Sequence, residues 1–192
     1  MPLWRPATLT PVTIVLWLLA VQGAIGAFDT LYFHEWRARL PAGGAQTKDE
    51  LLLHGARACI YAVIFATFPF LAWRGAWAGL LALLLLAEIA ITLADFVIED
   101  RVRKPLGGVF AGERTTHAIM GIVYGAMLAN LLPELRGWWS ADTALARVAS
   151  DAPAALRFTL VAMAMGVLAS GLRDLAAAFG VRGAAWPWAS TR

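Results

Sequence analysis

The sequence predicts an all-α integral membrane protein with five transmembrane helices, the first four of which form two tandem-repeat helical hairpins in a four-helix bundle. One reason is composition, because 60% of the residues are hydrophobic and only 15% are charged, a balance typical of membrane proteins. A second reason is a set of five long apolar runs. A third is an internal repeat that returns the same charged residues after 64 positions. We expect a single membrane domain over residues 1–192.

The apolar runs are long enough to cross a bilayer as helices, because a hydrocarbon layer of about 30 Å requires roughly 20 helical residues. They lie at about 11–33, 51–73, 76–98, 115–132 and 156–178. The first repeat covers about 11–73 and the second about 76–135, whereas the fifth helix has no repeat partner. In the linker before the fifth helix, at 137–155, we expect a short interfacial helix.

The repeat is clearest where residues 34–44 return at 98–108, with six of eleven positions identical. The identical pairs are Glu35 and Glu99, Arg37 and Arg101, Arg39 and Arg103, Pro41 and Pro105, Gly43 and Gly107, and Gly44 and Gly108. The two copies then continue, the second one residue shorter, into Glu50, His54 and Tyr61 and into Glu113, His117 and Tyr124. Each copy therefore carries a Glu, a tight loop, Glu-x-x-x-His and a Tyr two helical turns further on.

These repeated residues are candidate metal ligands. Positions i and i+4 share one face of a helix, so each Glu-x-x-x-His pair can offer a carboxylate and an imidazole to one metal. With one Glu from each of the other two helices, this is the ligand count of a di-metal carboxylate site in a four-helix bundle. The predicted ligands are Glu35, Glu50, His54, Glu99, Glu113 and His117, with His34 as an additional candidate.

Carboxylate and imidazole ligands suit iron, manganese or zinc. Two divalent cations would neutralise the four carboxylates, which matters because uncompensated charge at the edge of hydrocarbon is costly. We therefore expect two divalent metal ions, with iron favoured.

The ligand arrangement resembles that of ferritin-like di-iron proteins and of the membrane-associated alternative oxidases. The resemblance covers six positions and departs in spacing, because those families use Glu-x-x-His where this chain has Glu-Leu-Leu-Leu-His and Glu-Arg-Thr-Thr-His. It implies a metal-dependent oxidoreductase that uses O₂ on a hydrophobic or lipidic substrate or on quinol. Hydroxylase, desaturase and oxidase activity are all open.

Further polar residues lie at helical spacing on the same faces. Asp95, Tyr61 and Tyr124 are candidates for catalytic or proton-relay roles, although packing also explains the tyrosines. Arg57 must pair inside the bundle, because ionisable residues at such depth are otherwise costly, and we expect Glu88 or Asp95 as its partner. Asp29 and His34 have no copy in the third helix. They are candidates for an auxiliary ligand or a partner of a metal-binding histidine.

Five arginines are candidates for binding the anionic head group of a lipidic substrate, since guanidinium groups suit phosphate and carboxylate. They are Arg37, Arg39, Arg57, Arg101 and Arg103. Anchoring at lipid phosphates is the simpler alternative for the four in the loops.

Other interpretations remain open. Residues Thr47 to Glu50 match a capping box, and Glu35 with Arg39 or Glu99 with Arg103 could form salt bridges at helix ends. A b-type haem between two histidines would make the chain an electron-transfer subunit. A third possibility is a transport or structural subunit with a Glu-Arg-His ion-pair network.

The distribution of basic residues predicts the orientation. Eight basic residues lie on the side that holds loops 36–49 and 100–112, namely Arg37, Arg39, Lys48, Arg101, Arg103, Lys104, Arg182 and Arg192. Four lie on the other side, namely Arg5, Arg74, Arg136 and Arg147. We expect a multi-pass protein of the cytoplasmic membrane, with the N-terminus outside and both repeated loops in the cytoplasm. The expected partners are the lipid bilayer, a hydrophobic small molecule, and an electron donor or a second copy of the chain, but not nucleic acid.

Overall fold

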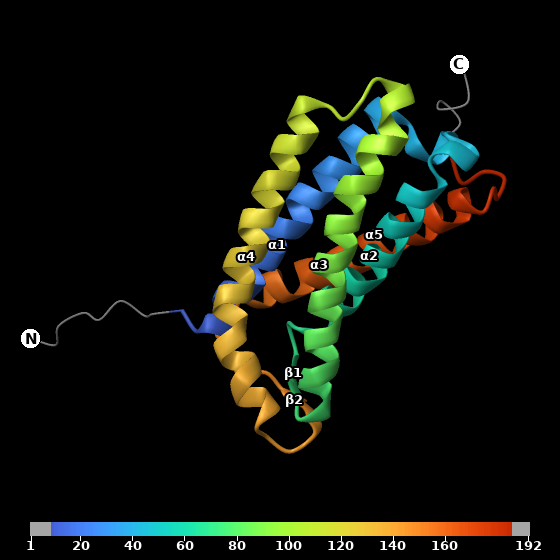
Figure 1. Ribbon diagram of the computed structural model, residues 1–192. Coiled ribbons are helices and arrows are strands. Elements are labelled where there is room, and N and C mark those ends of the chain that lie inside the picture. The colour runs from blue at the N-terminus through green and yellow to red at the C-terminus, as the bar shows by residue number, and fades with distance from the viewer. Residues whose placement is uncertain (1–8, 186–192) are drawn as a thin grey trace, which may run out of the picture.

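The computed structural model describes residues 9–185, and helices make up most of that range (Figure 1). Arg5 and Arg192, which enter the orientation prediction, lie outside the described residues. The long helices are α1 (Pro11–Phe28), extended by the π-helix η1 (Asp29–Ala38), α2 (Lys48–Thr67), α3 (Ala76–Arg103), α4 (Ala111–Trp139) and α5 (Ala154–Ala178). Within residues 9–185, five helical segments are long and apolar enough to cross a bilayer. The five predicted helices are confirmed.

The outer surface of the helices is apolar and much of the interior is charged. Val97, Ile122 and Met165 are each at least 70% exposed, whereas Glu50, Arg103 and Glu113 are completely buried. A soluble protein would bury the first group and expose the second. The distribution therefore matches a protein that has hydrocarbon around it.

Apolar and polar side chains occupy different ends of the interior. The apolar core lies near the start of α1, α3 and α5 and the end of α2 and α4, and it includes Leu16, Ile64, Leu81, Leu131 and Leu160. The opposite end, around the turns that follow η1 and α3, holds the buried acids, histidines and Arg103. All candidate ligands lie at this polar end.

The fifth helix packs closely along α2, and α1 packs along α4. Glycines permit the first contact, because a Cβ atom at Gly55 would overlap Leu175 and one at Gly171 would overlap Ala58. Small residues at such crossings allow close approach of helices in membranes. The fifth helix thus contributes directly to the interior at the polar end.

The turns after η1 and after α3 have related backbone structures. Each contains a short 3₁₀ turn around the repeated proline, η2 (Leu40–Ala42) and η4 (Lys104–Leu106), and a second 3₁₀ turn, η3 (Gly44–Gln46), follows in the first copy only. Gly44 and its repeat counterpart Gly108 both have positive φ, at 59° and 84°. Glycine suits these positions because side chains disfavour that conformation.

Two predictions about the connecting segments are wrong. The apolar run at 51–73 does not remain helical to its end, because α2 stops at Thr67 and a turn at Pro69 leads into strand β1 (Leu71–Arg74). Proline lacks the backbone N–H that a continuing helix requires. The linker at 137–155 holds strand β2 (Ala144–Arg147), which pairs antiparallel with β1, in place of the expected interfacial helix.

Candidate metal centre

Three histidines meet at the polar end of the helices. His34 comes from η1, His54 from α2 and His117 from α4, and each is at least nine-tenths buried. The rings of His34 and His54 stack with centroids 4.5 Å apart, and the ring of His117 lies edge-on at 6.4 Å from that of His34. The structure thus brings together the histidines of both repeat copies and the unrepeated His34.

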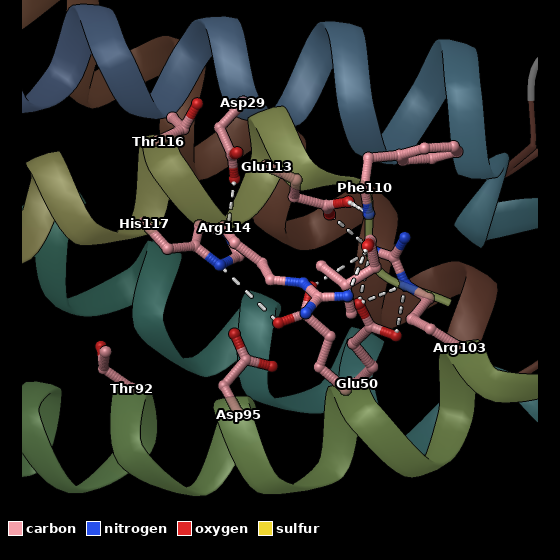
Figure 2. Close-up of polar contacts among 12 residues, drawn as sticks. Asp29, Glu50, Thr92, Asp95, Arg103, Phe110, Glu113, Arg114, Thr116 and His117 are labelled. Carbon is pink, nitrogen blue, oxygen red and sulfur yellow. Dashed lines mark hydrogen bonds and ion pairs between the residues drawn. The ribbon is translucent and has the colours of Figure 1, made fainter. Parts of the chain in front are cut away.

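The carboxylate of Asp29 joins two of these histidines. Its Oδ2 lies 3.3 Å from His34 Nε2 and 3.2 Å from His117 Nε2, and Figure 2 shows Asp29 pointing toward His117. The three ligand atoms lie within 4.8 Å of one another. Two imidazoles and one carboxylate form the ligand set of the facial triad that holds non-haem iron(II).

A π-helical turn brings two residues of this triad to the same face of the helix. Asp29 and His34 are five residues apart and both lie in η1. In an α-helix that spacing would turn the two side chains away from each other, whereas a π-helix has i→i+5 hydrogen bonds and aligns them. The periodicity of an α-helix therefore gives no reason to pair these two residues.

The triad suits a cation because two of its buried polar atoms make no hydrogen bond. Among the described residues, Asp29 Oδ1 and His34 Nε2 are fully buried and accept or donate no hydrogen bond. His34 Nε2 lies 3.2 Å from Glu113 Oε1 as well as close to Asp29, without hydrogen-bond geometry to either carboxylate. Buried polar atoms of this kind need an explanation, and a shared metal ion provides one.

A second carboxylate lies on the other side of the His117 ring. Glu99 Oε2 is 3.7 Å from His117 Nδ1, and Glu99, Glu113 and His117 form a second group whose ligand atoms lie within 4.8 Å of one another. Metal-binding histidines commonly present their other ring nitrogen to a carboxylate, which orients the imidazole. Glu99 is therefore suited to position His117 when Nε2 of His117 serves as the ligand.

Arg103 lies between two of the predicted ligands (Figure 2). Its Nε is 2.9 Å from Glu50 Oε1 and 3.0 Å from Glu50 Oε2, and its Nη2 is 3.0 Å from Glu113 Oε1. The side chain is fully buried, although the sequence suggested a head-group contact in a loop. The guanidinium is a permanent charge and compensates both carboxylates at the place where a second metal would bind them.

Glu35 pairs with a residue of the fifth helix and belongs to neither group of potential ligands. Its carboxylate forms an ion pair with Arg173 of α5, which also contacts Asp174 at 3.3 Å. The proposed helix-end pair of Glu35 with Arg39 is not the contact observed. The structure therefore does not assemble the six predicted ligands as one cluster.

The sequence suggested helix capping for Glu50 and not for Glu113, and the structure shows the opposite. In the first copy the hydroxyl of Thr47 donates to the Leu40 carbonyl oxygen, and Glu50 pairs with Arg103. In the second copy, where no capping hydroxyl precedes the Glu, the Phe110 N–H donates to Glu113 Oε2 at 3.4 Å. Helix capping thus accounts for part of the role of Glu113 and not for that of Glu50.

His54 has its closest acidic contact outside its own helix. Its Nε2 lies 3.3 Å from Asp95 Oδ2 and 4.0 Å from Glu50 Oε1. Asp95 Oδ2 is also 3.6 Å from Arg57 Nη1, which confirms the expected pairing of Arg57 with Asp95. His54 is thus held beside the triad by contacts with Asp95 and by stacking on His34.

The other predicted site residues fall into two groups. Arg37, Arg39 and Arg101 lie toward the surface, where Arg37 stacks over the Phe110 ring at 4.4 Å and Arg101 pairs with Asp49 at 3.0 Å. Tyr61 and Tyr124 are buried further into the helices, and their hydroxyls donate to Glu88 Oε1 and to the Leu85 carbonyl oxygen, both at 3.1 Å.

A cavity of about 890 Å³ extends from the histidines into the apolar part of the interior, and all five long helices contribute to its wall. His34, His54 and His117 lie in that wall. Its size is in the range of sites that bind drug-sized molecules. The fold and the polar residues thus define an integral membrane protein with a carboxylate–histidine centre at one end of a large internal cavity.

Comparisons with models of known protein families, with curated proteins and with solved structures find no match for this chain.

Proposed function

We propose that this chain is an integral membrane oxidoreductase whose carboxylate–histidine metal centre acts with O₂ on a hydrophobic molecule from the bilayer. The observation that carries the proposal is the triad of Asp29, His34 and His117 at one end of the cavity. Bound by this triad, iron, or manganese in its place, supplies the activation of O₂. The cavity would hold the substrate against the triad and away from bulk water.

The surrounding residues have roles that follow from their contacts. Glu99, at Nδ1 of His117, keeps the imidazole oriented with Nε2 toward Asp29. Glu113 offers a further oxygen beside His34, and Arg103 compensates its charge. Asp95 holds His54 next to His34.

We favour one metal ion over the two that the repeat suggests. The contacts of Arg103 with Glu50 and Glu113 support this choice, because both carboxylates are already paired with a fixed charge. A two-metal site would require Arg103 to leave them and Glu35 to leave Arg173.

The substrate reactions differ in their need for electrons. Hydroxylation transfers one oxygen atom of O₂ to the substrate and reduces the other to water, so it consumes two electrons and two protons from an external donor. Desaturation takes two hydrogen atoms from the substrate and the same number of electrons and protons from the donor, and it converts both oxygen atoms to water. Quinol oxidation needs no donor, because two quinols reduce one O₂ to two waters. A partner that donates electrons is therefore part of the proposal for the first two reactions only.

Haem binding is the weaker alternative. A b-type haem between His54 and His117 would have to displace the His34 ring that stacks on His54, and would leave the buried carboxylates without a role. A purely structural ion-pair network is the remaining alternative, and it would bind neither metal nor haem.

The tandem repeat and its membrane orientation belong to the same proposal. The 3₁₀ turns η2 and η4 are 64 residues apart, which supports a common origin of the two halves around a four-helix bundle.

We propose that loops 36–49 and 100–112 lie in the cytoplasm and the N-terminus outside. In a Cys59→Ser background, Arg101→Cys should react with a membrane-impermeant maleimide only in inverted vesicles, and reaction in right-side-out vesicles would reverse the orientation.

The deciding experiment is metal analysis by mass spectrometry together with an optical spectrum of the purified protein. About one iron or manganese per chain without a Soret band supports the proposal, and about two would restore the di-metal site. A Soret band would favour the haem alternative. Absence of both metal and haem would leave the structural network and remove the enzyme hypothesis.

A further inference from the structure

A second layer of polar residues lies on the apolar-core side of the layer that holds Asp29, His54, Asp95 and His117, which is called the histidine layer below. Gln22, Tyr61, Glu88 and Tyr124 each stand seven residues from a member of that layer on the same helix, namely Asp29, His54, Asp95 and His117. Seven helical residues correspond to about two turns and a rise of about 10 Å. All four residues of the second layer line the same cavity as the histidines.

Hydrogen bonds in the second layer leave one acceptor unused. The Tyr61 hydroxyl donates to Glu88 Oε1 at 3.1 Å, so its oxygen can only accept from Gln22, whose Nε2 lies 3.2 Å away. This fixes the orientation of the Gln22 amide. Its Oε1 is then a buried acceptor without a partner among the described residues, and Gln22 as a whole is more than nine-tenths buried.

The nearby carboxylate Glu88, to which Tyr61 donates, is an acceptor and does not supply the missing donor. Glu88 Oε1 also accepts from Thr92 at 3.1 Å, and Thr92 in turn lies 3.4 Å from Arg57 Nη1. These bonds run along α3 toward Asp95 and the histidines. Gln22 Oε1 is therefore suited to accept a hydrogen bond from a molecule in the cavity, because a buried acceptor without a donor is costly.

The cavity opens toward lipid between α3 and α4. Leu93 and Phe96 of α3 line it and are 59% and 42% exposed, and Ala118 and Gly121 of α4 line it and are exposed as well. A Cβ atom at Gly121 would meet no other atom within 4 Å. An apolar molecule can pass here without crossing the charged end of the protein.

We propose that the cavity binds an elongated apolar alcohol or phenol, which enters between α3 and α4 and donates its hydroxyl hydrogen to Gln22 Oε1. The apolar part then extends toward the histidine layer and passes the triad about 10 Å from the hydroxyl. The inference rests on the proposed function only for what happens to the molecule at the triad. Binding itself requires no metal.

Photolabelling in lipid nanodiscs tests binding directly. The probe is hexadecan-1-ol with a diazirine in mid-chain, used on metal-free protein, and the comparison probes are its methyl ether and the matching alkane. We expect saturable labelling by the alcohol on peptides around His54 and His117, and roughly fivefold to tenfold weaker apparent affinity for the methyl ether, which lacks the donor. The ether comparison uses the unaltered protein, so it does not depend on the folding of a variant.

Two variants test the individual residues. Gln22→Leu should weaken alcohol binding to the level of the ether, whereas Asn130→Leu, which removes an amide from outside the cavity wall, should not. Gly121→Trp should prevent labelling by obstructing the opening. Equal labelling by alcohol, ether and alkane would overturn the proposal.

Metal content measured on the same untreated preparation separates this proposal from the proposed function. Selective labelling in a protein that never binds metal would support the cavity and contradict the oxidoreductase. Metal binding without selectivity for the alcohol would support the metal centre and contradict the proposed binding of an alcohol or phenol.

Discussion

Asp29 Oδ2 lies 3.2 Å from His117 Nε2, although the two residues are 88 positions apart in the chain. His117 belongs to the repeat, and the position that corresponds to Asp29 in the second copy is Leu93. The candidate metal centre therefore combines a repeated residue with an unrepeated one. The two halves of the repeat therefore make unequal contributions to the centre.

The triad and the repeat make different predictions for two acidic residues of η1. Asp29→Asn should reduce metal affinity at least about 100-fold, since the effect of losing a ligand should exceed the 10- to 100-fold effect of an outer partner. Glu35→Gln should retain the metal, because Glu35 pairs with Arg173. Metal content after dialysis against a weak chelator measures both. Loss of metal from Glu35→Gln with retention in Asp29→Asn would reinstate the ligand set expected from the repeat.

Two arginines two residues apart should differ greatly in their contribution to stability. Arg103→Met leaves Glu50 and Glu113 as uncompensated buried charges, so we expect the free energy of unfolding to fall by about 3–5 kcal/mol. Arg101→Met removes an ion pair with Asp49 that is largely exposed, and its effect should stay within about 1 kcal/mol. Unfolding in mixed micelles measures both, and similar losses in the two variants would contradict the buried network.

The contact between α2 and α5 depends on Gly171. An added methyl group would overlap the Cβ atom of Ala58, so Gly171→Ala should lower the free energy of unfolding by about 1–3 kcal/mol. A Cβ atom at Gly166, on the same helix, would meet no other atom within 4 Å. Gly166→Ala should therefore be neutral or slightly stabilising. Thermal unfolding of the two variants checks the pair, and a stable Gly171→Ala would show that the helices are not in close contact.

Asp151 anchors the start of α1 in a pH-dependent way. Its Oδ1 accepts hydrogen bonds from the hydroxyls of Thr10 and Thr13, and these bonds lower the pKa of the carboxyl. A lowered pKa in the folded state means that the stabilisation is present above the ordinary carboxyl pKa of about 3.9 and is lost as the pH falls through the lower, folded-state value.

Hydrogen exchange at the start of α1 measures this effect. Between about pH 5 and pH 3, protection there should fall in the unaltered protein, after correction for intrinsic exchange, and should stay constant and low in Asp151→Asn. An equal change in both proteins would exclude Asp151 as the cause.

Much of the fold follows from the composition and the periodicity of the chain. Five apolar runs must form helices in hydrocarbon, because no other backbone structure there satisfies its own hydrogen bonds without closing a sheet. The five predicted helices coincide with the observed ones in their central parts, but Pro69 stops α2 before the apolar run ends, and α4 continues to Trp139, beyond the predicted end at 132. The strand pair β1 and β2 could not be anticipated, since the paired residues lie 70 to 76 positions apart in the chain.

Part of the candidate site was also predictable from local spacing. The repeat singled out His54, Glu99, Glu113 and His117. The cost of unpaired charge predicted Glu88 or Asp95 as the partner of Arg57, and Asp95 is the partner observed. Local spacing could not tell which acid faces which base, because a carboxylate is equally suited to a metal, a guanidinium or a helix N-terminus.

By itself, the sequence determined the five helices, the apolar exterior and the end of the helices at which most charged residues lie, because hydrophobic length and helical periodicity act locally. Apart from Arg57, for which the sequence left Glu88 and Asp95 as candidate partners, only the tertiary structure decided the partners of those charges. The π-helical turn of η1 aligns Asp29 with His34. Arg173 of α5 pairs with Glu35. Arg103, at the end of α3, is buried and pairs with Glu50 and Glu113. The first depends on a local backbone conformation and the other two on contacts between different helices, and no short pattern of residues specifies either.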